Sequence, residues 1–263
     1  MNPYKSIENE TPGRVGCRIH YFEEVGSTQD VARELAQSGC AAGTVVIAEL
    51  QTKGRGRMGR AWHSPAGVNL YTTIVVRPRM KISEVARMSL VAGVAAADTL
   101  APLAPGIVGL KWPNDIWLSG RKSGGIISEA VTDSSGSLTA AMLGIGLNLN
   151  LRAGDIPPEL RDKATSLLIA TGVACDRVGV AAGLFSNLDR LVADIESGGF
   201  AAIRPAWERY SALTGKQVTV VDAGIRETGK VRGIDDDGAL LLETPSGVRR
   251  IIAGDVTLEG AYS

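Results

Sequence analysis

Histidine and cysteine are scarce in this 263-residue chain, and each shortage excludes a class of site. The two histidines, His20 and His63, lie in no motif that supports a Ser-His-Asp triad or a histidine-based metal site, so we interpret both as structural. The three cysteines, Cys17, Cys40 and Cys175, are widely spaced and form no CxxC pair. This pattern indicates reduced thiols rather than a disulfide framework or a zinc site.

Excess charge and long apolar runs are missing as well. Lysine plus arginine and aspartate plus glutamate both number 28, so the formal net charge is zero. A protein that holds nucleic acid through bulk charge usually has a basic excess, so we expect no nucleic-acid partner, and any basic site must be local. No apolar run reaches the ~18 residues of a membrane span, and the N-terminus has no signal-peptide core. We therefore expect a soluble, cytoplasmic protein without a membrane partner.

The chain divides by composition into three parts. Residues 1–18 are polar and are expected to form a flexible lead-in. Residues 19–214 mix helices and β-hairpins in runs, without strict βαβ alternation, which indicates an α+β domain. Residues 215–263 hold short apolar segments broken by "DAG", "DDDG" and "PSG", which predicts a small, separate β-barrel.

Helix signals are clearest in "STQDVARELAQSG". Ser27 is a good N-cap with Asp30 three residues later, and Gly39 ends the segment. A second, longer helix is expected from a Ser83 cap to near Pro102. The other predicted elements are helices at 178–196 and 205–213 and strands at 44–50, 68–76, 107–112, 115–118, 125–131, 138–150, 217–221, 229–234, 239–244 and 248–252.

The segment "QTKGRGRMGR" at 51–60 matches the pattern G-x-G-x-x-G through Gly54, Gly56 and Gly59. A dinucleotide-binding turn needs a helix that begins at the last glycine, but Pro65 and a β-rich run follow here. The interpretation as a dinucleotide-binding turn therefore fails. An RNA-binding arginine-glycine tract usually has many repeats in a disordered segment, and this one lies between two predicted strands.

A loop that wraps a small anion fits this segment better. Glycines let the backbone approach a ligand closely, and arginines offer forked donors to carboxylate or phosphate. The alternative is a flexible surface hairpin with incidental charge.

Three segments, "GRGRMGR" at 54–60, "KWPNDIWLSGRKSGGIISE" at 111–129 and "GIGLNLN" at 144–150, resemble the signature segments of biotin protein ligases in order and spacing. The helix start "GSTQD" and the C-terminal β-rich segment also match. The resemblance implies an α+β catalytic domain of the biotin/lipoate ligase and class II aminoacyl-tRNA synthetase kind, with a mixed sheet, followed by an SH3-like β-barrel. It implies an enzyme that joins biotin to AMP using MgATP. Biotin then passes to one lysine of a biotin carboxyl carrier protein.

The resemblance also implies the site. Lys122, Arg57 and Asp115 would be catalytic, and Asp115 would bind the magnesium ion. The residues expected at biotin are Ser27, Thr28, Gln29, Gln51, Gly54, Arg55, Gly56, Arg57, Lys122, Gly124 and Gly125, and those expected at the nucleotide are Arg57, Arg60, Trp62, Lys111, Asn114, Asp115 and Asn148. Each motif has a simpler reading too: Ser27 as a plain helix cap, 111–125 as an ordinary hairpin, and Trp62 as a core aromatic.

The chain departs from the family pattern at two places. Met58 stands where many relatives carry another arginine, and the loop 151–166, expected to close over the adenylate, lacks the tryptophan that stacks on adenine in some relatives. A lipoate or octanoate ligase of the same fold is one alternative function, and the catalytic part of a bifunctional ligase-repressor is another. About twenty residues precede the expected catalytic domain, which favours the monofunctional class. Such enzymes commonly form homodimers.

Overall fold

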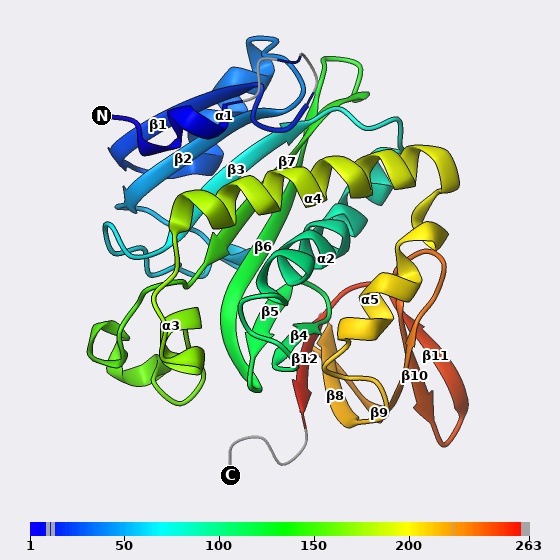
Figure 1. Cartoon of the computed structure of the whole chain (residues 1–263). Helices are drawn as coiled ribbons and strands as arrows, with labels where there is room; N and C mark the ends of the chain where they lie inside the picture. The colour runs from blue at the N-terminus through cyan, green and yellow to red at the C-terminus, as the bar shows by residue number, and fades with distance from the viewer. Residues whose placement is uncertain (9–10, 12–13, 223, 259–263) are drawn as a thin grey trace.

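Two sheets organise the chain, and the larger has seven strands in the order β1-β2-β3-β7-β6-β5-β4 (Figure 1). The computed structural model describes residues 1–8, 11, 14–222 and 224–258. β1 pairs with β2 in parallel, and all other neighbours pair antiparallel, so the sheet is mixed and the predicted α+β class is confirmed. The strands are β1 Arg18–Val25, β2 Thr44–Gln51, β3 Leu70–Val76, β4 Val108–Lys111, β5 Asp115–Leu118, β6 Arg121–Thr132 and β7 Leu138–Leu147.

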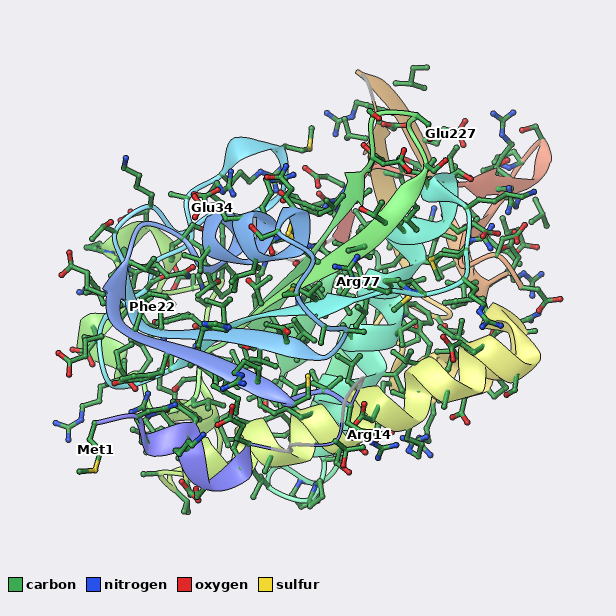
Figure 2. All side chains as sticks on the ribbon, turned by 90° about the horizontal axis from the view of Figure 1, so that it is seen from above. Met1, Arg14, Phe22, Glu34, Arg77 and Glu227 are labelled. Carbon is green, nitrogen blue, oxygen red and sulfur yellow. The ribbon has the colours of Figure 1, made fainter. Side chains whose placement is uncertain are left out.

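Helices cover both faces of this sheet. Helix α1 (Thr28–Gln37) lies on one side, and α4 (Arg177–Gly198) lies on the other with α2 (Met88–Leu100) between it and the sheet (Figures 1 and 2). Nearly every residue of α2 is buried, as expected for a helix that is apolar on all sides. The remaining helices are α3 Leu167–Thr171 and α5 Arg204–Tyr210, with 3-10 turns η1 Pro3–Ile7, η2 Arg57–Gly59, η3 Ile82–Arg87, η4 Ala153–Asp155, η5 Pro158–Leu160 and η6 Phe200–Ala202.

The helix starts test the capping predictions. Ser27 caps α1 as predicted, and its hydroxyl oxygen accepts from the Gln29 backbone N–H at 3.3 Å. The predicted Ser83 cap is wrong. Ser83 lies inside η3, because the Glu84 carboxylate instead accepts from the Lys81 backbone N–H at 2.8 Å and starts a 3-10 turn there.

The second sheet is antiparallel, in the order β11-β10-β9-β8-β12, which matches the predicted SH3-like module. Its strands are β8 Gln217–Asp222, β9 Ile225–Ile234, β10 Leu240–Thr244, β11 Gly247–Ile251 and β12 Asp255–Leu258, of which β12 was not predicted. The turn between β9 and β10 contacts the main domain. Trp112 Nε1 donates to the Gly238 carbonyl oxygen at 3.0 Å, and Arg87 pairs with Asp237 at 2.9 Å.

The first residues of the chain are packed rather than loose. Tyr4, in η1, is 1% exposed, and its burial raises the pKa of the phenol to about 12. Residues 9–10 and 12–13 of the expected lead-in, and 223 and 259–263 of the expected barrel, lie outside the described residues. Among the residues that are described, every helix is too short or too polar to cross a bilayer.

Candidate active site

A cavity of about 440 Å³ brings together most of the site residues predicted from sequence. Its wall includes the α1 N-terminus, the arginine-glycine loop, the 111–115 turn, strands β6 and β7, the 156–164 loop and β12. The predicted residues that line it are Ser27, Thr28, Gln29, Gln51, Arg55, Gly56, Arg57, Arg60, Trp62, Lys111, Asn114, Asp115, Lys122, Gly125 and Asn148. Gly54 and Gly124 are absent from the wall.

Glycines of β6 and β7 make a flat floor under two of these side chains. A Cβ on Gly144 would stand 3.0 Å from the Gln29 side chain, and a Cβ on Gly146 would stand 2.7 Å from Trp62 Nε1. Gly125, paired with Gly146 across the strands, would meet the same indole at 3.1 Å. The glycines are needed because these side chains lie directly on the sheet backbone.

Gly54 and Gly124 serve the backbone rather than the cavity. A Cβ at Gly54 would stand 2.6 Å from both the Ser64 hydroxyl oxygen and the Trp62 carbonyl oxygen. A Cβ at Gly124 would stand 2.9 Å from the Gly146 carbonyl oxygen. Both positions therefore allow close packing behind the wall.

Polar side-chain atoms at the inner end of the cavity have no hydrogen-bond partner within the described chain. Gln29 is 3% exposed, yet both its amide nitrogen and its amide oxygen are unpaired. Thr72 Oγ1 is buried and unpaired as well. So is Nε1 of Trp62, whose ring lies farther along the cavity, 5.4 Å from Lys122 Nζ. Leaving one such group unsatisfied costs about 1–3 kcal/mol, so this end is built for a ligand that carries both donors and acceptors.

Cations gather at the other end, each beside a carboxylate or amide. Lys122 Nζ lies 2.6 Å from Asp115 Oδ1, and their side chains are 36% and 18% exposed. Arg57 donates to Asn114 Oδ1 at 3.1 Å. Burial lowers the pKa of Lys111, which still has Asp115 nearby as a counter-charge. The predicted phosphate and carboxylate ligands thus lie together around the 111–115 turn.

The second sheet supplies an acid that sequence reasoning missed. Asp255, on β12, pairs with Arg60 and lies 4.0 Å from Arg57. Val256 and Thr257 also line the cavity. Met58 adopts a left-handed backbone at φ 55° and is 78% exposed, so its side chain takes no part in the wall.

The loop after β7 is hydrogen-bonded to both sides of the Lys122 backbone. Lys122 N donates to the Lys163 carbonyl oxygen at 2.9 Å, and Thr165 N donates to the Lys122 carbonyl oxygen at 2.8 Å. Asn148, predicted to read adenine, donates from Nδ2 to the Thr165 carbonyl oxygen at 3.0 Å. Its amide is therefore already engaged in holding this loop.

The two histidines lie apart from each other. The His63 ring nitrogen Nε2 is 3.2 Å from the Asp155 carbonyl oxygen, so His63 contacts the same loop from the cavity side. His20 lies on β1, where burial lowers its pKa. Among the described residues, no three His, Cys, Asp or Glu side chains form a metal cluster.

This arrangement suits a ligand with a neutral, hydrogen-bonding head and an anionic tail. The head would satisfy the amide of Gln29, and the tail would meet Lys122 and Arg57. Cations held in a partly closed cavity also stabilise negative charge that develops during a reaction.

Comparison with known proteins agrees with this geometry. Residues 21–148 match the biotin/lipoate A/B protein ligase family, and residues 213–258 match the biotin protein ligase C-terminal domain. The chain is 36% identical to the biotin–[acetyl-CoA-carboxylase] ligase of Paracoccus denitrificans over 89% of this chain and 98% of that protein. It is also 36% identical to the bifunctional ligase/repressor BirA of Bacillus subtilis, over 93% of this chain and 75% of that protein. Among solved structures, the Aquifex aeolicus biotin protein ligase with biotin and ATP superposes with a TM-score of 0.79 at 30% identity, covering 92% of this chain and 98% of that one.

Proposed function

The chain belongs to the biotin protein ligase family, and from that premise we propose how its own residues carry out the ATP-dependent transfer of biotin to a carboxylase. The observation that carries the proposal is the two-ended cavity. Its inner end holds the unpaired amide of Gln29, and its outer end holds Lys122 and Arg57.

The inner end receives the ureido ring of biotin. This ring offers two N–H donors and one carbonyl acceptor, which complement the amide of Gln29 and the hydroxyl of Ser27 at the start of α1. The dithiolane ring of a lipoyl group has no such groups and would leave Gln29 unsatisfied. Biotin is therefore favoured over lipoate or octanoate.

Lys122 and Arg57 direct the first half-reaction. The biotin carboxylate attacks the α-phosphorus of ATP, and pyrophosphate leaves as biotinyl-5′-AMP forms. The reaction needs no protein nucleophile, so the enzyme acts by positioning the two substrates and by stabilising charge. Lys122 exchanges its present partner, Asp115, for the substrate carboxylate and the α-phosphate oxygens. Arg57, Arg60 and Lys111 neutralise the phosphates.

Asp115 fits the site of a magnesium ion. Magnesium bound with nucleotides commonly takes one or two protein carboxylates and completes its shell with phosphate oxygens and water. Asp115 offers such a carboxylate within the cavity, beside Asn114. When bound there, the ion would neutralise charge on the phosphates.

The second half-reaction takes place at the mouth of the same cavity. The uncharged amine of the acceptor lysine attacks the anhydride carbonyl, an amide forms, and AMP leaves. Arg57 and the 151–166 loop retain the adenylate until the acceptor arrives. We propose a biotin carboxyl carrier domain as the acceptor. We also propose a cytoplasmic location, which the three free cysteines support. We propose a homodimer as well, because enzymes of this family commonly form homodimers.

Intact-mass spectrometry tests the function directly. A carrier domain incubated with the protein, biotin and MgATP should gain the mass of one biotinyl group. A carrier with its acceptor lysine changed to arginine is the matched control and should gain none. Excess lipoate or octanoate should not compete. Transfer of lipoate in preference to biotin would refute the assignment.

A further inference from the structure

Gln51 is held in the cavity wall by hydrogen bonds of defined direction. Its amide oxygen accepts from the backbone N–H of Thr28 at 2.9 Å and from the Thr28 hydroxyl at 3.1 Å. Its amide nitrogen donates to the hydroxyl oxygen of Ser64 at 3.2 Å. The oxygen thus has two donors, and the nitrogen keeps one N–H that is not used within this network.

Two buried hydroxyls outside the cavity wall fix these directions. Thr73 is 0% exposed and donates to the Thr28 hydroxyl oxygen at 2.8 Å, which leaves the Thr28 proton to point at Gln51. Ser64 is 6% exposed and donates to the Trp62 carbonyl oxygen at 3.0 Å, so toward Gln51 it acts as an acceptor.

Reversal of the Gln51 amide is opposed at both ends. Its NH₂ group would then face the backbone N–H of Thr28, a donor that cannot reverse. Its oxygen would face Ser64, whose proton is already donated to Trp62. Each mismatch replaces a hydrogen bond by two like groups, which disfavours the reversed amide by roughly 10- to 100-fold.

We infer that Ser64 and Thr73 are positioning residues that make Gln51 a donor toward the substrate. The inference rests on the proposed function, because the substrate is then biotin and its ureido carbonyl oxygen is the acceptor that Gln51 meets. The ureido N–H groups need acceptors elsewhere, and the unpaired amide oxygen of Gln29 provides one. Selectivity for the ureido carbonyl is thus set partly by residues that the substrate does not touch.

A substrate analogue isolates this contact. In protonated 2-iminobiotin, a guanidinium replaces the ureido group, so the head carries N–H donors and no acceptor. In the wild-type protein the N–H of Gln51 would then face another N–H instead of an acceptor. Protonated 2-iminobiotin should therefore bind at least about 100-fold more weakly than biotin, since a site built to donate a hydrogen bond disfavours a ligand that has no acceptor there. Equal affinity of the wild-type protein for the two ligands at neutral pH would overturn the inference without any variant.

Variants then separate positioning from packing. Thr73→Val keeps the shape and removes the hydroxyl, Thr73→Ser keeps the hydroxyl, and Ser64→Ala removes the second anchor. We measure dissociation constants for both ligands, together with kcat and KM for biotin in adenylate formation and the melting temperature of each variant. Thr73→Val and Ser64→Ala should lower the biotin to 2-iminobiotin affinity ratio about tenfold, with kcat changed less than about threefold, and Thr73→Ser should keep the wild-type ratio.

The outcomes distinguish this inference from the function on which it rests. A wild-type protein that forms no biotinyl-adenylate refutes the proposed function. A wild-type protein that forms it, with ratios unchanged in both Thr73→Val and Ser64→Ala, refutes the positioning role alone. A purely structural role would weaken both ligands equally and leave the ratio as it was.

Discussion

Replacing Lys122 by alanine tests the electrostatic account of adenylation most directly. Lys122 Nζ lies 2.6 Å from Asp115 Oδ1 at the cationic end of the cavity. The substitution removes the cation that faces both the incoming carboxylate and the α-phosphate. It leaves the backbone hydrogen bonds of residue 122 to the following loop in place, because they involve only main-chain atoms.

The effect should fall on the rate rather than on stability. Loss of one preorganised charge-stabilising group costs about 2–4 kcal/mol in the barrier, or roughly 30- to 1000-fold in the adenylation rate. The Lys122–Asp115 pair is partly exposed, at 36% and 18%, so its loss should lower the free energy of unfolding by no more than about 1 kcal/mol.

Biotin-dependent pyrophosphate release measures the first half-reaction. Arg121→Ala is the matched control, because it removes an equal charge from the neighbouring, exposed residue of β6, and it should retain the wild-type rate. The double variant Lys122→Ala with Asp115→Asn removes the unpaired carboxylate left by the single change and should not recover activity. Pyrophosphate release by Lys122→Ala within about threefold of wild type would refute the reasoning.

Three further substitutions probe other parts of the molecule. Arg57→Gly should weaken retention of the adenylate by roughly 1.5–3 kcal/mol, so serum albumin mixed with enzyme, biotin and MgATP should be labelled more than with wild type; equal labelling would mean that Arg57 does not retain it. Arg77, labelled in Figure 2, donates to the carbonyl oxygens of Ala36 and Cys40 near the end of α1 and of Thr139 on β7. Arg77→Ala should therefore lower the free energy of unfolding by about 2–3 kcal/mol in urea titrations, and an unchanged midpoint would contradict this. Gly146→Ala should displace Trp62, because the new Cβ stands 2.7 Å from its Nε1; KM for the substrates should rise at least about tenfold with little change in melting temperature, and an unchanged KM would show that the indole position is irrelevant.

Local signals in the sequence predicted local structure well. The cap at Ser27 and the apolar segments of the main sheet from β2 onward follow from nearest-neighbour chemistry, and the structure has them within a few residues. The edge strand β1 was not predicted. The error at Ser83 arose because two capping signals overlap in this segment. The helical turn starts earlier, at Lys81, whose backbone N–H donates to the Glu84 carboxylate. Strand β12 was missed because its pairing partner β8 lies far along the chain, so no hairpin turn between the two strands marks it in the sequence.

The candidate site likewise contains residues that could be predicted from the sequence and residues that could not. Residues within motifs, such as Lys122 and Asp115, could be found from sequence because their spacing is characteristic. Asp255 could not, because its meeting with Arg60 depends on how the second sheet packs against the first. Ser64 and Thr73 carry no motif of their own, and their role depends on hydrogen-bond direction, which only the folded geometry specifies.

The docking of the second sheet has a consequence for how activity is lost on heating. A module that runs from Gln217 to Leu258 is of a size that is marginal when isolated, and its buried apolar residues belong to the same cluster as those of the main domain. Hydrogen bonds such as that of Trp112 to Gly238 also hold it against the main domain. Since the same module contributes Asp255 to the cavity, partial detachment would open the catalytic cavity while the larger sheet stays folded. Heat inactivation should therefore precede global unfolding, and saturating substrate should narrow the interval between the two temperatures.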